Sequence, residues 1–252
     1  MRYARLKAHP TAVAVPAKTK QEAPMQREQT SYSPLFLGLT SLFVTCLLIS
    51  NIIANKLMQV GGIVLPSAVI LFPVTYILAD VFTEVYGFKK TRMVIWIGFA
   101  ANAFMSLIFL VVIALPYPQF FADQAAYATV LGSTPRILAA SLAGYLAGEF
   151  SNSILLSVLK KVTKGRYLWT RTIGSTIVGE GLDTILFIFI AFVGIVPSPA
   201  LLQMMLAQYL FKVSYEVIFT PLTYLVVGFI KRREQIDTFD SEVVYNPFSL
   251  GE

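Results

Sequence analysis

Acidic side chains occur in pairs at helical spacing inside apolar stretches of this chain. Asp80 and Glu84 stand four residues apart within VILFPVTYILADVFTEVYG, and Glu180 and Asp183 stand three apart within IGSTIVGEGLDTILF. Residues at these spacings share one face of a helix. A carboxylate inside an apolar helix is costly unless it faces protein or water, so by default it marks a functional site. We therefore predict that both pairs line a polar site.

Asparagines accompany these acids. Asn51 and Asn55 stand one turn apart at the end of the first apolar stretch, and Glu149 is followed by Asn152 on the same side of a helix. Asparagines in a membrane can simply hydrogen-bond across helices, and that alternative stays open for Asn51. A buried acid without a neighbouring base favours a functional role for Glu149.

One lysine lies within the apolar stretches. Lys212 precedes Glu216 by four residues, which is the less favourable order for an ion pair within one helix. We therefore expect Lys212 to reach an acid on another helix, with Asp80 and Asp183 as candidates. A purely structural ion pair is the alternative.

Six acids against one base cannot all be ionised in a dry core. Some must be protonated, or they line a wet cavity, or they await a ligand rich in hydrogen-bond donors. A guanine-type purine fits the last case, because one carboxylate can accept from its ring N–H and its exocyclic amine together. Tyr76, Phe72 or Phe187 would then stack on the ring. Donor-rich vitamins or cations fit nearly as well.

The composition is that of a polytopic helical membrane protein. Of 252 residues, 56% are hydrophobic and only 13% are charged, whereas soluble domains carry about 25% charged residues. The apolar segments reach the length of a membrane-spanning helix and lack the strict alternation of barrel strands. Basic grooves and stacking platforms for nucleic acid are absent from the sequence.

The predicted fold is an all-α bundle of six transmembrane helices. Lys and Arg alternate between rich and poor connections, which predicts that both termini face the cytoplasm. Three helices per half also permits a 3+3 inverted repeat. We expect a disordered cytosolic tail over 1–33, the bundle over 34–233 and a solvated cytosolic tail over 234–252. The predicted spans are Leu35–Ala54, Pro66–Tyr86, Met93–Leu115, Ile137–Val158, Thr172–Val193 and Ala200–Phe229, the last tilted or kinked at Pro221.

The sequence contains few residues that could form a metal site or a known catalytic motif. Cys46 is the only cysteine and His9 the only histidine, which excludes a metal site built from these residue types; we expect no cofactor. Zinc-protease and phosphate-loop motifs are missing. The stretch GEGLD is similar to the Gly-x-Gly-Asp signature of intramembrane aspartyl proteases, but Asp183 falls one position late. We predict that the chain is not an enzyme.

Several stretches resemble the queuosine precursor transporter family, also described as a vitamin uptake transporter family. They are SN at Ser50–Asn51, FPVTYILADVFTEVYGFKKTR, RTIGSTIVGEGLDTILFIFIAF and FKVSYEVIFTPLTY. The resemblance runs over about 35–233 and implies import of 7-cyano- or 7-aminomethyl-7-deazaguanine across the inner membrane of bacteria. By this resemblance the site comprises Asn51, Asp80, Glu84, Glu149, Asn152, Asp183 and Lys212, to which the spacing adds Glu180.

Other functions stay open at this point. The six-helix layout also looks like the substrate-binding subunits of energy-coupling-factor importers, which need a separate energising module. A membrane scaffold without transport is a further alternative. The sequence leaves open the choice of deazapurine, proton coupling against facilitated diffusion, and assembly as a homodimer.

Overall fold

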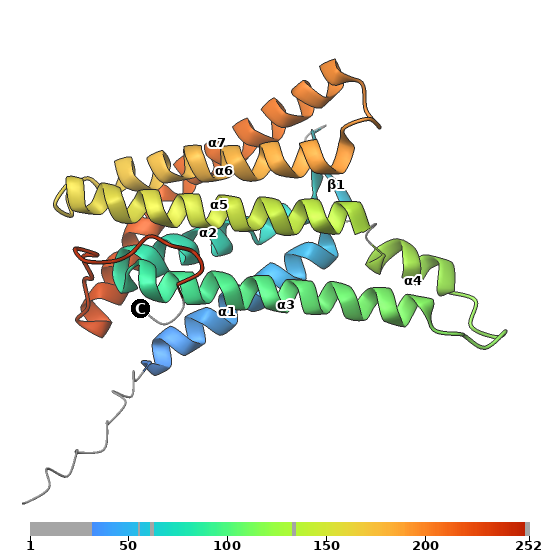
Figure 1. Ribbon diagram of the computed structural model, residues 1–252, viewed down its shortest axis with the longest axis horizontal. Helices are drawn as coiled ribbons and strands as arrows, with labels where there is room; N and C mark the ends of the chain where they lie inside the picture. Colours follow the sequence, from blue (N-terminus) through green and yellow to red (C-terminus); the bar gives the residue numbers. More distant parts are fainter. Residues whose placement is uncertain (1–31, 55, 61–62, 133–134, 250–252) are drawn as a thin grey trace, which may run out of the picture. The chain divides into compact units, whose positions relative to one another are not determined.

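Long helices make up most of the computed structural model, which describes residues 32–249 except 55, 61–62 and 133–134 (Figure 1). Residues 1–31 of the predicted tail 1–33 therefore lie outside the described residues, and so does Asn55. In chain order the elements are α1 (Pro34–Ile53), β1 (Leu57–Val60), β2 (Ile63–Pro66), a 3-10 turn η1 (Ser67–Ile70), α2 (Phe72–Val81), a π-helical turn η2 (Phe82–Tyr86), α3 (Phe88–Ala114), α4 (Gln124–Leu131), α5 (Pro135–Val162), α6 (Leu168–Phe192) and α7 (Ser198–Glu234).

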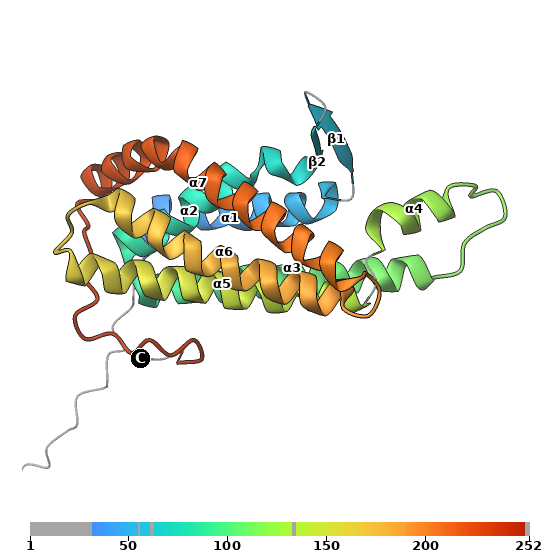
Figure 2. The ribbon, with the colours of Figure 1, turned by 90° about the horizontal axis from the view of Figure 1, so that it is seen from above.

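Within the described residues, five helical stretches are long and apolar enough to cross a membrane. They contain α1, α3, α5, α6 and α7, and the one with α5 also includes α4. The chain is thus a multi-pass helical membrane protein, as the composition predicts. Helix α7 contains Pro221 and changes direction part-way along its length (Figure 2).

The sixth predicted span, Pro66–Tyr86, is not one continuous helix. Pro66 ends β2, the 3-10 turn η1 follows, and α2 begins only at Phe72 with Pro73 in its first turn. Proline has no backbone N–H and is tolerated in the first turn of a helix but not inside it, so Pro73 fixes a new start. The last five residues before Gly87 then widen into the π-helical turn η2.

A short hairpin adds a small β element to the predicted all-α fold. Strands β1 and β2 pair antiparallel with Leu57 opposite Pro66 and Val60 opposite Ile63. The hairpin and α4 lie toward the end of the bundle away from the C-terminal segment (Figures 1 and 2). The all-α prediction holds for the bundle and misses this connection.

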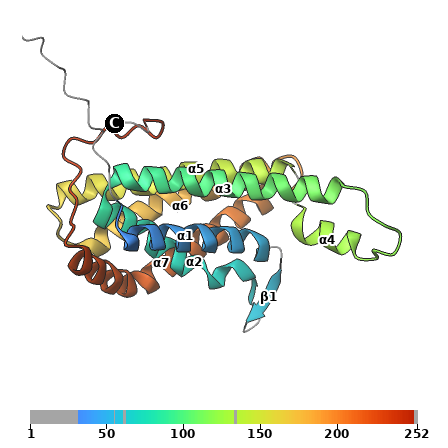
Figure 3. The ribbon, with the colours of Figure 1, turned by 90° about the horizontal axis from the view of Figure 1, so that it is seen from below.

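Helix α2 lies inside the bundle, where it packs against α1, α5 and α7 (Figure 3). Aromatic side chains fix its end against α1: Phe36 lies edge-on to Phe82 and Tyr86, with ring centres 5.7 and 4.9 Å apart. Phe43 makes a similar contact with Phe82. These rings are buried, so this junction forms the main apolar core and holds α2 in place.

Glycines allow α5 and α6 to pack very closely. A Cβ atom at Gly148 would lie 2.8 Å from the Asp183 Cβ, and one at Gly179 would lie 2.8 Å from the Asn152 Cβ and 2.9 Å from the Gly148 carbonyl oxygen. Real Cβ atoms do not approach so near. This close contact of α5 and α6 sets the spacing of Asn152 and Asp183.

We expect Gly179→Ala to destabilise the protein by about 1–3 kcal/mol, because the new methyl group overpacks this contact. Gly181→Ala, two residues along α6, is the matched control: its Cβ would meet only the Tyr209 ring at 3.6 Å. Alanine is the better helix former, so Gly181→Ala should leave stability unchanged or raise it. Thermal unfolding of the purified variants measures both, and equal behaviour of the two would contradict the packing described.

The segment after α7 packs on the bundle, unlike the predicted solvated tail. Asp240 is 5% exposed and accepts hydrogen bonds from the Phe88 N–H (2.9 Å) and the Ser157 hydroxyl (2.5 Å). Trp96 donates to the Pro247 carbonyl at 2.7 Å. The start of α3 exposes backbone N–H groups that need acceptors, and Asp240 supplies one. Polar composition alone does not separate such a segment from a solvated one.

Candidate functional site

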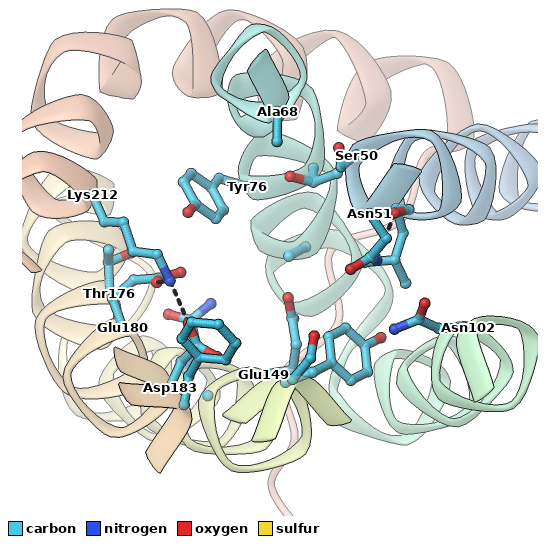
Figure 4. Close-up of a pocket in the computed structure, with 18 of the residues that line it drawn as sticks. Ser50, Asn51, Ala68, Tyr76, Asn102, Glu149, Thr176, Glu180, Asp183 and Lys212 are labelled. Carbon is cyan, nitrogen blue, oxygen red and sulfur yellow. Dashed lines mark hydrogen bonds and ion pairs between the residues drawn. The ribbon is translucent and has the colours of Figure 1, made fainter. Parts of the chain in front are cut away.

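A cavity of about 240 Å³ opens between α1, α2, α3, α5, α6 and α7 (Figure 4). It is somewhat smaller than the range of about 300–1,000 Å³ typical of drug-sized ligands, so it suits a small one. Seven of the eight predicted site residues line it: Asn51, Asp80, Glu149, Asn152, Glu180, Asp183 and Lys212.

Lys212 carries the positive charge of the cavity. Its ammonium lies 2.7 Å from Glu180 and forms a hydrogen-bonded ion pair with Asp183, both on α6 (Figure 4). The prediction that Lys212 reaches an acid on another helix is confirmed for Asp183, and Glu180 joins it. Since Lys212 is 7% exposed, one cation holds two acids in a largely dry setting.

Asp80 has a weaker environment. Its carboxylate accepts one long hydrogen bond, 3.4 Å, from the Asn152 amide on α5, and its other oxygen has no hydrogen-bond partner among the described residues. Asp80 is 2% exposed. This acid is therefore nearly dry and forms no ion pair with any described residue.

Glu149 lies free in the cavity. Figure 4 shows its side chain directed from α5 into the open space, on the side opposite Lys212. Across the described part of the chain no hydrogen bond or ion pair joins its carboxylate to another side chain. Glu149 is thus the acid with its oxygens available to a ligand.

Aromatic side chains border the same space. Tyr76 on α2 and Phe187 on α6 line the cavity, as the sequence predicts for stacking residues, while the side chain of Phe72 is outside the described ones. Asn51 lines it too, although its amide donates to the Leu47 carbonyl of its own helix at 2.9 Å.

Some lining residues were not predicted. Asn102 on α3 is 3% exposed, and Tyr145 on α5 donates its hydroxyl to the Ile95 carbonyl at 3.1 Å. A lone asparagine inside the apolar run IGFAANAFMS was the available signal for Asn102. The sequence offered no comparable signal for Tyr145, because tyrosines are common at the ends and faces of membrane helices.

The structure places Glu84 apart from the cavity, in a buried cluster of charges at the end of the bundle. Its carboxylate lies 2.7 Å from both Arg171 and Lys231 and 3.7 Å from Lys160. Glu84, Arg171 and Lys160 are each at most 2% exposed. Arg171, in the first turn of α6, thus points into the bundle. Glu84 therefore neutralises cations and does not face the cavity.

Asp237 completes this cluster from the C-terminal segment. It contacts Lys160 at 2.5 Å and Lys231 at 2.9 Å. Burial alone would raise the pKa of the Asp237 carboxyl, but the hydrogen bonds from Lys160 and Lys231 outweigh it and hold the pKa below its usual range. Asp237 thus stays ionised at neutral pH and ties the segment to the bundle.

Comparison with known proteins identifies the chain's family. Residues 66–226, more than half of the chain, match the model of the family described as "Putative vitamin uptake transporter". The chain belongs to the vitamin uptake transporter family. The matched region contains α2, α5 and α7 as far as residue 226, and every acid that lines the cavity.

A curated relative of this vitamin uptake transporter points the same way. A protein of Bacillus subtilis (strain 168) named "Probable queuosine precursor transporter" is 25% identical over 187 residues, which cover 74% of this chain and 82% of the relative. No solved structure matches the chain. The family and the relative are transporters and not enzymes, so the resemblance drawn from the sequence is confirmed at this level.

Proposed function

We propose that this transporter imports a queuosine precursor of the 7-deazaguanine type and binds it in the cavity around Glu149. The observation that carries the proposal is the carboxylate of Glu149, directed into the cavity without a partner among the described side chains (Figure 4). The printed name of the Bacillus subtilis relative supports the substrate class.

The chemistry of the cavity fits a donor-rich bicyclic ligand. The Glu149 carboxylate can accept from the ring N–H and the exocyclic amine together, a bidentate and charge-assisted arrangement. Tyr76 and Phe187 supply aromatic faces, and Asn51, Asn102 and Asn152 supply amides for the remaining polar atoms. Lys212 holds Glu180 and Asp183, so these acids do not compete for the ligand's donors in this conformation.

We further propose that the end of the bundle holding the charged cluster faces the cytoplasm of a bacterium, in its inner membrane. The start of α3, the connection between α5 and α6, and the end of α7 all lie at this end (Figure 1). Lys89, Lys90, Lys161, Lys164 and Lys231–Arg233 gather there, and basic residues mark the cytoplasmic side. Both termini would then be cytoplasmic.

Binding to the detergent-purified protein tests the substrate proposal. We expect 7-cyano-7-deazaguanine to raise the unfolding temperature and to bind more tightly than guanine in calorimetry. Glu149→Gln should weaken binding by about 10–100-fold, because hydrogen bonds to a charged group contribute about 1.5–3 kcal/mol and the amide turns a donor toward the ligand's donors.

Glu242→Gln is the matched control, since Glu242 is an exposed acid of the C-terminal segment away from the cavity. Full binding by this variant shows that loss of an acid as such does not matter. Unchanged affinity of folded Glu149→Gln would overturn the assignment of Glu149, and no binding by folded wild-type protein would overturn the substrate class.

A further inference from the structure

Glu216 is a buried acid that the cavity does not use. It lies on α7, one turn after Lys212, is 2% exposed, and does not belong to the cavity lining. One of its carboxylate oxygens, Oε1, has no hydrogen-bond partner among the described residues, and none of the ion pairs found there includes Glu216. An ionised carboxylate left in this state would be strongly unfavourable.

The neighbouring lysine does not neutralise Glu216. Residues four apart lie on one helix face, so Lys212 is within reach in principle. Its ammonium is turned to α6, where Glu180 and Asp183 hold it. One cation already balances two acids there, which leaves no positive charge for Glu216.

The other elements packed against α7 add negative charge. Among the acids on these elements, Glu84 on η2 forms ion pairs with Arg171 and Lys231, which neutralise its negative charge. Asp80 on α2, which packs against the helix of Glu216, forms no ion pair in the described part of the chain, and its carboxylate and that of Glu216 repel each other. The acidic and basic groups on α7 and on the elements packed against it near Glu216 are thus Asp80, Glu84, Glu180, Asp183 and Lys212, with the tyrosines Tyr76, Tyr209 and Tyr215.

Two acids without a cation cannot both be ionised at close range in a dry core. We propose that Glu216 holds a proton in this conformation and exchanges it in each transport cycle, so that uptake of the substrate is coupled to the proton gradient. The proposal rests on the transport function proposed above and adds a proton as the second substrate.

The arrangement suggests how the exchange would act on the cavity. When water reaches Glu216 in another conformation, the carboxyl gives its proton to water and becomes a carboxylate. Lys212, one turn away, then has a new partner on its own helix and a weaker hold on Glu180 and Asp183. Those acids line the same cavity as Glu149, so a proton at Glu216 and a ligand in the cavity influence each other.

Proteoliposomes that contain only this chain test the coupling, with radiolabelled 7-cyano-7-deazaguanine as the probe. Exchange of labelled for unlabelled probe without a gradient reports the carrier itself. For wild type we expect an inside-alkaline gradient of about one pH unit to drive accumulation up to about tenfold for one proton per substrate. Glu216→Gln, which is permanently neutral, should keep the exchange and lose the accumulation, while Glu242→Gln behaves as wild type.

Each outcome decides one point. Exchange by wild type without any response to the gradient overturns the coupling but leaves the transporter, and absence of exchange by folded wild type overturns the proposed function. Accumulation by Glu216→Gln shows that another group carries the proton. If Glu216→Gln does not fold, Glu216→Asp moves the carboxyl by one methylene and should shift the pH profile of gradient-driven uptake; an unshifted profile overturns the role of Glu216.

Discussion

Lys212→Met should abolish uptake and destabilise the protein by about 3–5 kcal/mol, because it leaves two largely buried acids without their cation. Lys212 contacts both Glu180 and Asp183, and Met keeps the length of the side chain but not the charge. Thermal unfolding in detergent measures the loss of stability, and uptake into proteoliposomes measures the loss of function. Lys164→Met, at an exposed position outside the bundle, is the control and should show neither effect.

A triple variant separates the two effects of Lys212. Lys212→Met combined with Glu180→Gln and Asp183→Asn removes the cation together with both acids, so it should recover most of the lost stability. We expect it to remain inactive, because the polar wall of the cavity no longer carries charge. A single Lys212→Met variant with wild-type stability would contradict the ion pairs described here.

Glu84→Gln should also destabilise the protein by about 3–5 kcal/mol, but without altering the affinity of the folded protein for its ligand. Glu84 balances Lys160, Arg171 and Lys231, and only Asp237 would remain to do so. The midpoint of thermal unfolding and the dissociation constant of 7-cyano-7-deazaguanine, measured on the same preparation, check both parts.

Adding Lys231→Gln to Glu84→Gln removes one of the unbalanced cations and should recover part of the stability. Glu242→Gln again controls for the loss of a carboxylate. If folded Glu84→Gln bound ligand much more weakly than wild type, then the assignment of Glu84 to the substrate site, made from sequence, would hold against the structure.

The contrast between Asp80 and Glu84 shows where reasoning from sequence reached its limit. Two residues that are four apart in sequence lie on the same face of an α-helix. Phe82–Tyr86 is instead a π-helical turn with i to i+5 hydrogen bonds, in which this spacing no longer holds. The wider turn directs Glu84 away from the cavity that Asp80 lines. The sequence ADVFTEVYG contains no signal for a π-helical turn. The α-helical spacing was therefore applied to a segment that is not α-helical.

The predictions about charge were correct where they depended only on the cost of an unpaired charge inside a membrane. A lysine in an apolar helix must find an acid, and the poor order of Lys212 and Glu216 correctly predicted a partner on another helix. Asn102 and Tyr145 were not predicted to line the cavity, because a single polar side chain can find hydrogen-bond partners in many positions of a helix bundle. The sequence also did not show that the predicted span Pro66–Tyr86 is divided into the end of β2, the turn η1 and helix α2.

The position of the C-terminal segment has a consequence for biosynthesis. Glu84 and Lys160 are made before α6 and α7, but Lys231 and Asp237, which contact them, are among the last residues made. A growing chain that has just inserted α5 and α6 therefore carries a charged surface that it cannot yet cover. A chain that ends before Asp237 would have all seven α-helices of the described residues, since α7 ends at Glu234, and would still leave this charged surface open.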